Sequence, residues 1–205
     1  MEITQPDFIE QVINQFKQTS ALEWAGVVTA FACIVLAAMG HILNWPVSII
    51  SSAAYAVLYY RFKLYGDSFL QLYFLATAVY GWYYWLKREK RHEKPIVQLS
   101  ASGWLIAIAA IAILAALLSV FLDNYTNTDV PYIDGFCTAM SFVAQILMAR
   151  KVLQNWVLWI IVDVCYVPLL LYKGLASTAV LYAVLVVLAV LGYVEWKRIW
   201  KQEAR

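Results

Sequence analysis

Residues 102–122 read "SGWLIAIAAIAILAALLSVFL", a stretch of 21 residues whose interior has one polar side chain, Ser119. A helix of about 20 apolar residues spans a bilayer, whereas a surface helix of a soluble domain carries a polar face. The rest of the chain agrees, because 63% of its 205 residues are hydrophobic and only 14% are charged. Long Leu, Val, Ala and Ile runs indicate helices rather than the short alternating strands of a membrane barrel. We therefore predict an all-α integral membrane protein.

Apolar stretches of about this length recur along the chain and predict seven transmembrane helices. They lie at residues 22–40, 45–61, 67–86, 102–122, 133–149, 155–172 and 177–196. Residues 1–20 carry apolar side chains at helical spacing opposite polar ones, which predicts an amphipathic helix at the membrane surface.

The basic residues are distributed unequally between the two sides of the membrane. Four lie on one side, namely Lys17, Arg61, Lys63 and Lys173. The other eleven, on the opposite side, are Lys87, Arg88, Lys90, Arg91, Lys94, Arg150, Lys151, Lys197, Arg198, Lys201 and Arg205. Because cytoplasmic loops carry the excess of Lys and Arg, we expect an outside N-terminus and a cytoplasmic C-terminus. The net charge of +2 gives no reason to expect a nucleic-acid partner.

The sequence contains an internal repeat with a constant spacing of 111 residues. Asn44, Trp45, Tyr55, Leu64, Gly81 and Trp85 recur as Asn155, Trp156, Tyr166, Leu175, Gly192 and Trp196. A gap-free offset over this length indicates two copies of one unit. Three spans end on the far side of the membrane and the fourth span returns the chain, so both copies have the same orientation.

This repeat predicts the domain organisation. We expect an N-terminal amphipathic segment (1–20), a first three-helix repeat with a basic loop (21–98), a connector helix with an outer loop (99–130), and a second three-helix repeat with a basic C-terminus (131–205). Parallel 3+1+3 repeats occur in SWEET-type transporters, where the substrate binds between the repeats near the middle of the membrane.

One carboxylate, Asp163, lies at membrane depth in the sixth span. It shares a helical face with Trp156, Trp159 and Tyr166, at spacings of three, four and three residues. An Asp at the centre of a membrane helix costs about 2.5–3.5 kcal/mol, so it normally faces a cavity or a partner. Asp163 is therefore either a hydrogen-bonded or protonated structural residue or a ligand-binding one. Aromatic neighbours favour an aromatic cation as ligand.

Other polar and aromatic residues at membrane depth are candidates for the same site. The offset maps the face of Asp163 onto Trp45, Ser48, Ser52 and Tyr55, without a charge. Buried amides and hydroxyls serve either as ties between helices or as contacts to a polar solute. The candidate substrate-binding residues are Asp163, Trp159, Trp156, Tyr166, Gln145, Ser141, Gln71, Ser52, Ser48, Tyr55, Asn44, Asn155, Tyr80 and Trp82. We predict no catalytic residue, metal site or cofactor.

Three stretches carry a resemblance to a known family. These are "LQLYFLATAVYGWYYW" (70–85), "MARKVLQNWVLWIIVDV" (148–164) and "YKGLASTAVLY" (172–182). They resemble the PnuC-type vitamin transporters, whose members carry nicotinamide riboside, riboflavin or thiamine. Carriers of nicotinamide riboside in that family have the pattern W-x-x-W-x-x-x-N, which here is Trp156, Trp159 and Asp163, with Asp in place of Asn. The segment "VDVCYVPLLLYKGL" is most similar to the thiamine (PnuT) branch.

The resemblance implies a function and its partners. It implies facilitated diffusion of a B-type vitamin by alternating access, trapping of the vitamin by a cytoplasmic kinase, a homotrimer, and a location in the bacterial inner membrane. With Asp163 it favours thiamine, whose thiazolium is a fixed cation, and nicotinamide riboside is the alternative. A non-transporting vitamin-binding subunit and an intramembrane enzyme are the competing classes. The enzyme would need a second buried acid or a His near Asp163, and we expect neither.

Overall fold

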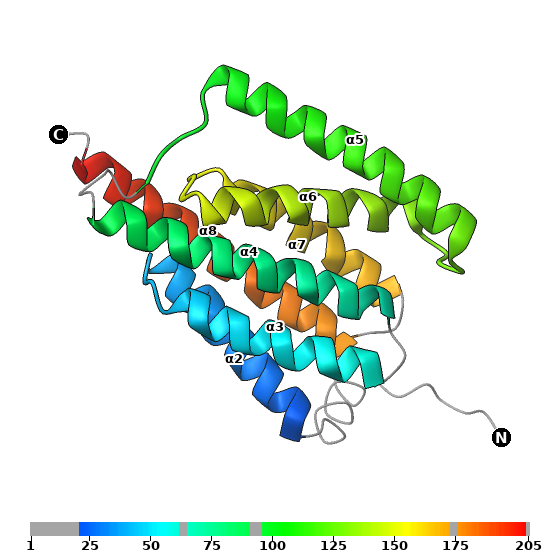
Figure 1. The fold of residues 1–205 in the computed structure, drawn as a ribbon. Helices are drawn as coiled ribbons and strands as arrows, with labels where there is room; N and C mark the ends of the chain where they lie inside the picture. The colour runs from blue at the N-terminus through cyan, green and yellow to red at the C-terminus, as the bar shows by residue number, and fades with distance from the viewer. Residues whose placement is uncertain (1–20, 62–64, 91–95, 173–175, 204–205) are drawn as a thin grey trace.

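The described part of the computed structural model, residues 21–61, 65–90, 96–172 and 176–203, is a bundle of seven helices (Figure 1). These are α2 (Ala21–Ala38), α3 (Asn44–Arg61), α4 (Tyr65–Lys90), α5 (Ala101–Tyr125), α6 (Pro131–Ala149), α7 (Asn155–Tyr172) and α8 (Ala176–Glu203). The all-helical prediction is confirmed. The expected surface helix at 1–20 lies outside the described residues.

Each predicted span coincides with one helix, but α4 and α8 are longer than expected. They continue to Lys90 and Glu203, whereas the apolar stretches end at residues 86 and 196. Lys, Arg and Glu are good helix formers, so a helix does not end where its apolar segment does. In α8 the added turns include an ion pair in which Arg198 Nη2 lies 2.6 Å from Glu195 Oε1. By length and composition, α5, α6, α7 and α8 qualify as membrane spans within the described residues. Membrane crossing by the other helices stays a prediction.

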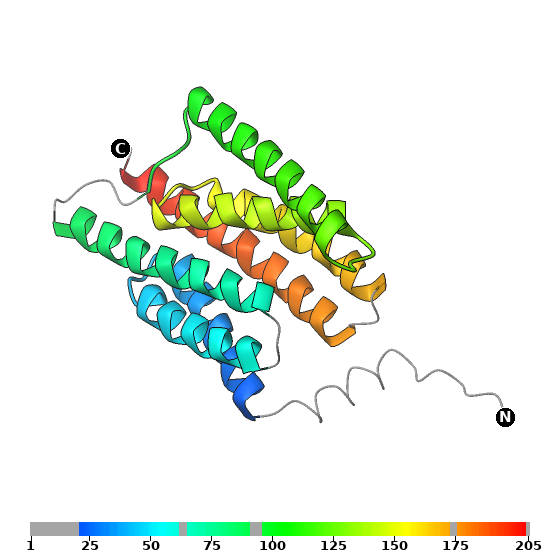
Figure 2. The same cartoon turned by 45° about the vertical axis from the view of Figure 1, so that its right-hand side comes forward.

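Helix α5 lies on the outside of the bundle, next to α6 (Figures 1 and 2). Its first turn is capped by Ser100, whose hydroxyl accepts a hydrogen bond of 3.2 Å from the Gly103 N–H. It packs on α6 and on no other described helix. The two backbones approach closely where Ser119 meets Gly135, because a Cβ on Gly135 would lie 2.7 Å from the Ser119 nitrogen. The one polar side chain inside the 102–122 stretch therefore marks a helix contact.

The remaining six helices form two groups with equivalent contacts, α2–α4 and α6–α8, here called the two halves. Within each half the second helix packs on the first and on the third, and between the halves α2 packs on α8 and α4 on α6. The turns before α3 and α7 are also equivalent. Asn44 Nδ2 donates to the His41 carbonyl (2.8 Å), and Asn155 Nδ2 donates to the Val152 carbonyl (2.7 Å).

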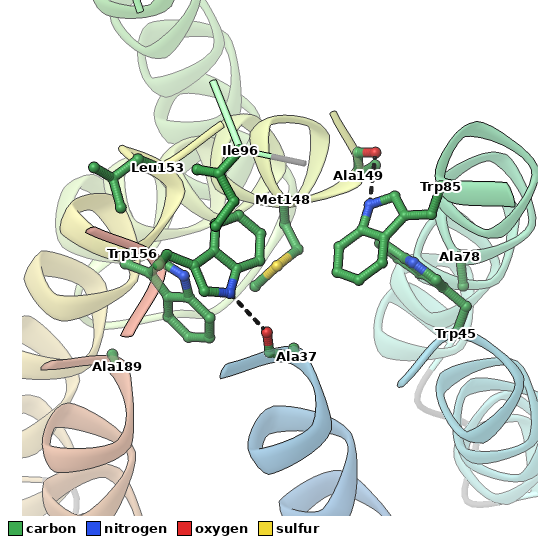
Figure 3. Packing of buried hydrophobic residues seen from close by; sticks show 11 residues of the cluster. Ala37, Trp45, Ala78, Trp85, Ile96, Met148, Ala149, Leu153, Trp156 and Ala189 are labelled. Atoms are coloured by element: carbon green, nitrogen blue, oxygen red, sulfur yellow. Dashed lines mark hydrogen bonds between the residues drawn. The ribbon is translucent and has the colours of Figure 1, made fainter. Parts of the chain in front are cut away.

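Four buried tryptophans join the halves at the end of the bundle that carries the basic residues (Figure 3). Within the first half Trp45 meets Trp85 edge to face (5.3 Å, 88°), and Trp156 meets Trp196 in the same way in the second half (5.6 Å, 88°). The contacts between halves are hydrogen bonds. Trp85 Nε1 donates to the Ala149 carbonyl of α6 (3.1 Å), and Trp196 Nε1 donates to the Ala37 carbonyl of α2 (3.0 Å). Each half is thus bound to the other by an equivalent bond.

We predict that Gly192→Ala destabilises the fold. A Cβ at Gly192 would lie 2.7 Å from Cζ2 of Trp156, and the same ring position is met by Gly81 against Trp45. Overpacking of this kind costs about 1–3 kcal/mol, because the buried indole has no room to move. Thermal unfolding in detergent measures the effect. Gly103→Ala is the control, since it meets only side-chain atoms, at 3.0 Å or more, and should leave stability unchanged or raised. Equal stability of both variants would contradict the close packing of glycine on tryptophan.

Candidate functional site

A cavity of about 500 Å³ lies between the two halves. Its walls come from α2, α3 and α4 on one side and from α6, α7 and α8 on the other. Eleven of the predicted site residues line it: Asp163, Trp159, Trp156, Tyr166, Gln145, Ser141, Gln71, Ser52, Ser48, Tyr55 and Asn44. The structure thus brings together residues that lie up to 122 positions apart in the chain, from Asn44 to Tyr166.

Three predicted residues lie outside this cavity. Tyr80 and Trp82 are exposed on the outer surface of the bundle, each with 38% of its side chain accessible. Trp82 shares a face with Gln71, but eleven residues of helix place it about 16 Å farther along the axis, at the level of the tryptophan cluster. Asn155 is fully buried in the turn before α7, where its amide donates to Val152. Its other predicted counterpart, Asn44, lines the cavity and caps the equivalent turn.

Asp163 has the most informative environment in the cavity. It lies in the middle of α7 and is 6% exposed, between Trp159 and Tyr166 on the same face. It has neither a hydrogen bond nor an ion pair with any residue that the structure describes. Tyr166 in turn packs against Tyr182 of α8 with ring centroids 5.0 Å apart. A buried carboxylate without a protein partner is costly, so its position in a cavity wall favours a ligand as the partner.

The wall formed by α3 carries hydroxyl groups in place of the charge. Ser48, Ser51, Ser52 and Tyr55 all line the cavity, and the hydroxyl of Ser51 accepts a hydrogen bond of 3.3 Å from Thr29 of α2. Ser51 lies one turn after Ser48, a spacing that could have identified it from the sequence. The cavity is therefore acidic on one side and neutral but polar on the other.

The amides and hydroxyls of α4 and α6 have mixed roles. Gln145 Nε2 donates to Thr77 Oγ1 across the two helices at 3.5 Å, which fits the interpretation as a helix tie. Ser141 donates to the Cys137 carbonyl of its own helix (2.9 Å), so its oxygen stays available as an acceptor. Gln71 lines the cavity from α4.

Sequence reasoning missed several residues of the cavity wall. The polar ones besides Ser51 are Thr138 of α6 and Tyr182 of α8. Thr138 lies one turn before Ser141, so helical spacing was a usable signal, whereas Tyr182 stands in an aliphatic run and gave none. In the described part of the chain, His, Cys, Asp and Glu do not gather in groups of three that could hold a metal ion. The lining residues include Asp163 as their one charged side chain.

Comparison with known proteins identifies relatives over nearly the whole chain. The sequence profile of a family described as "Nicotinamide mononucleotide transporter" matches residues 20–198. The "Nicotinamide riboside transporter PnuC" of Escherichia coli (strain K12) is 27% identical over 212 residues, which cover 91% of this chain and 87% of the relative. That of Neisseria mucosa is 28% identical, covering 96% and 79%. The "Riboflavin/roseoflavin transporter RibM" of Streptomyces davaonensis is 26% identical, covering 84% of each.

A solved structure agrees with this relationship. The "Crystal structure of the Vitamin B3 transporter PnuC" superposes with a TM-score of 0.73 at 27% identity, covering 95% of this chain and 88% of the other. The similarity therefore extends to the arrangement of the helices.

We predict that Asp163→Asn weakens binding of an aromatic cation such as nicotinamide riboside or thiamine. Interactions with a charged group contribute about 1.5–3 kcal/mol, so the loss should be roughly tenfold to a hundredfold in affinity. Calorimetry on the purified protein in detergent measures it. Ser52→Ala, in the opposite wall, is the control and should cost about tenfold or less, since it removes one neutral hydroxyl. If Asp163→Asn binds the cation as tightly as the unmodified protein, the charge has no part in recognition.

Proposed function

Because the chain belongs to the nicotinamide mononucleotide transporter family, we propose that it carries a cationic B-type vitamin across the membrane through the cavity between its halves. Membership confirms the resemblance to PnuC-type transporters. The relatives are transporters, so the chain is a multi-pass membrane transport protein and not an enzyme. The observation that carries the substrate proposal is the buried, unpartnered carboxylate of Asp163, flanked by Trp159 and Tyr166 in the cavity wall.

The charge of the cavity favours an unphosphorylated substrate. The family takes its description from a mononucleotide, but the described lining residues hold one acid and no Lys, Arg or His. A phosphate group would enter an acidic, poorly hydrated site without a cationic partner, which is unfavourable. A cationic ring can instead meet Asp163 and stack on the aromatic side chains.

Nicotinamide riboside is our first candidate, because it names the Escherichia coli and Neisseria mucosa relatives and is an aromatic cation. Its ribose hydroxyls suit the serines of α3. Thiamine, also a cation, is the second candidate. It rests on Asp163 in place of the family's Asn and on the likeness to the thiamine branch, while the relatives described above are named for nicotinamide riboside or riboflavin. Riboflavin lacks the positive charge that would pair with Asp163.

We further propose the parallel 3+1+3 arrangement for this transport. The equivalent contacts of the two halves support it, as does the position of α5 outside the bundle. The excess of basic residues supports a cytoplasmic C-terminus and an outside N-terminus. Transport then proceeds by alternating access without ATP. A cytoplasmic kinase that adds a phosphate retains the vitamin inside, and a homotrimer is the expected assembly.

Uptake by vesicles tests this function. We expect purified protein, reconstituted without ATP or any other protein, to take up nicotinamide riboside until its concentrations inside and outside are equal. Nicotinamide mononucleotide should enter no faster than into protein-free vesicles, because its phosphate meets no cation. Thiamine and riboflavin are measured in parallel. Uptake of thiamine alone would favour the second candidate, and tight binding without uptake of any vitamin would favour a vitamin-binding subunit.

A further inference from the structure

The first helix of each half ends in the same backbone turn, but the residue at its strained position differs. Gly40 after α2 has φ 67°, and Lys151 after α6, 111 residues later, has φ 56°. The hydrogen bonds of the two turns correspond one to one. Gly40 and Lys151 N–H groups donate to Ala37 and Met148 carbonyls, and those of His41 and Val152 donate to Leu36 and Leu147, all at 2.8–2.9 Å.

A lysine in this left-handed conformation is strained where glycine is not. Such outliers persist when surrounding contacts hold them, and they point to a functional role. The contact here is with Trp85, because Lys151 Nζ lies 4.2 Å from the centroid of its ring. The other cation–π pairs of the described residues, Lys87 with Tyr83, Arg88 with Tyr84 and Lys197 with Tyr193, join residues four apart on one helix at 5.4–5.9 Å. Lys151 alone among them joins the two halves.

Trp85 is therefore held from the opposite half at two places. Its N–H donates to the Ala149 carbonyl, and Lys151 covers the face of its ring. The equivalent Trp196 donates to the Ala37 carbonyl, but the residue equivalent to Lys151 is Gly40, which has no side chain to cover it.

The rest of the contact between α4 and α6, here called the α4–α6 seam, is also more polar than its counterpart. Tyr73 Oη donates to the Phe142 carbonyl (2.8 Å), and Gln145 Nε2 donates to Thr77 Oγ1 (3.5 Å). By the offset of 111, the positions of Tyr73, Thr77 and Gln145 are filled in α8 and α2 by Val184, Leu188 and Ile34. These aliphatic side chains cannot make the corresponding hydrogen bonds. The α2–α8 seam is thus apolar at the positions where the α4–α6 seam is hydrogen-bonded.

We propose that the two seams have different roles in transport: the α4–α6 seam is the hinge, fixed by Lys151 over Trp85, and the α2–α8 seam is the one that opens. Lys151 is then a positioning residue, which acts through Trp85 and does not line the cavity. This inference rests on the proposed function, because the seams need to move only if the cavity alternates between the two sides. Aliphatic contacts can separate and re-form without leaving hydrogen-bonding groups unpaired, which suits a seam that opens.

Distance measurements between spin labels in lipid nanodiscs test the proposal. One label pair, Val28→Cys with Val184→Cys, spans the α2–α8 seam, and the other, Leu72→Cys with Phe136→Cys, spans the α4–α6 seam. All four positions are exposed, and the native Cys33, Cys137 and Cys165 are first replaced by alanine. We expect two or more distances across α2–α8 and one narrow distance across α4–α6. Several distances across α4–α6, or one narrow distance across both seams, would overturn the proposal.

The Lys151→Gly variant tests the role of the lysine without endangering the fold, because glycine relieves the strained φ. We expect the α4–α6 distance to broaden and uptake of nicotinamide riboside or thiamine to fall severalfold at unchanged binding affinity. Lys151→Arg should retain the narrow distance, and Lys197→Ala, which removes a cation–π pair within α8, is the matched control. An unchanged α4–α6 distance in Lys151→Gly overturns the role of Lys151. Distances as expected in a protein that moves no vitamin would instead reject the proposed function.

Discussion

The two indole hydrogen bonds between the halves are the interaction on which the rest of the structure depends. Trp85 and Trp196 each donate to a backbone carbonyl at the end of the first helix of the opposite half. Inside a membrane protein an unpaired N–H or carbonyl is costly, so these bonds determine how the halves approach one another. They also require glycine at positions 81 and 192, where the rings of Trp45 and Trp156 lie against the helix backbone. The halves therefore meet closely at the basic end and leave a cavity farther along.

The cavity gives a common explanation for polar residues that would otherwise be unfavourable at membrane depth. Asp163, Gln71 and the serines of α3 all face it and come from different helices. Because the two halves carry different residues at equivalent positions, the cavity has an acidic wall opposite a hydroxyl-bearing one. An asymmetric solute with a cationic ring suits such a site. The same inequality recurs at the seams, where Lys151 in one half corresponds to Gly40 in the other.

Much of the architecture could be predicted because hydrophobic length and period are local properties. The seven stretches matched helices, and the face shared by Trp156, Trp159, Asp163 and Tyr166 became part of the cavity wall. Helical period gives the direction in which a side chain points, but not whether its level along the axis is open or filled. Trp82 therefore shares a face with Gln71 and still lies beyond the cavity. Asn155 was chosen through its repeat partner, although a local turn binds its amide.

The sequence by itself determined the membrane class, the positions of the helices, the equivalence of residues 111 apart and the isolated carboxylate in the sixth apolar stretch. These follow from composition and spacing, which act through the bilayer and the helix without reference to other parts of the chain. Only the tertiary structure decided that Asp163 has no partner among the described residues, that Thr138 and Tyr182 join its cavity, and that Lys151 reaches the ring of Trp85. Such contacts join residues that are distant in sequence, and they depend on how the two halves dock, which no local pattern encodes.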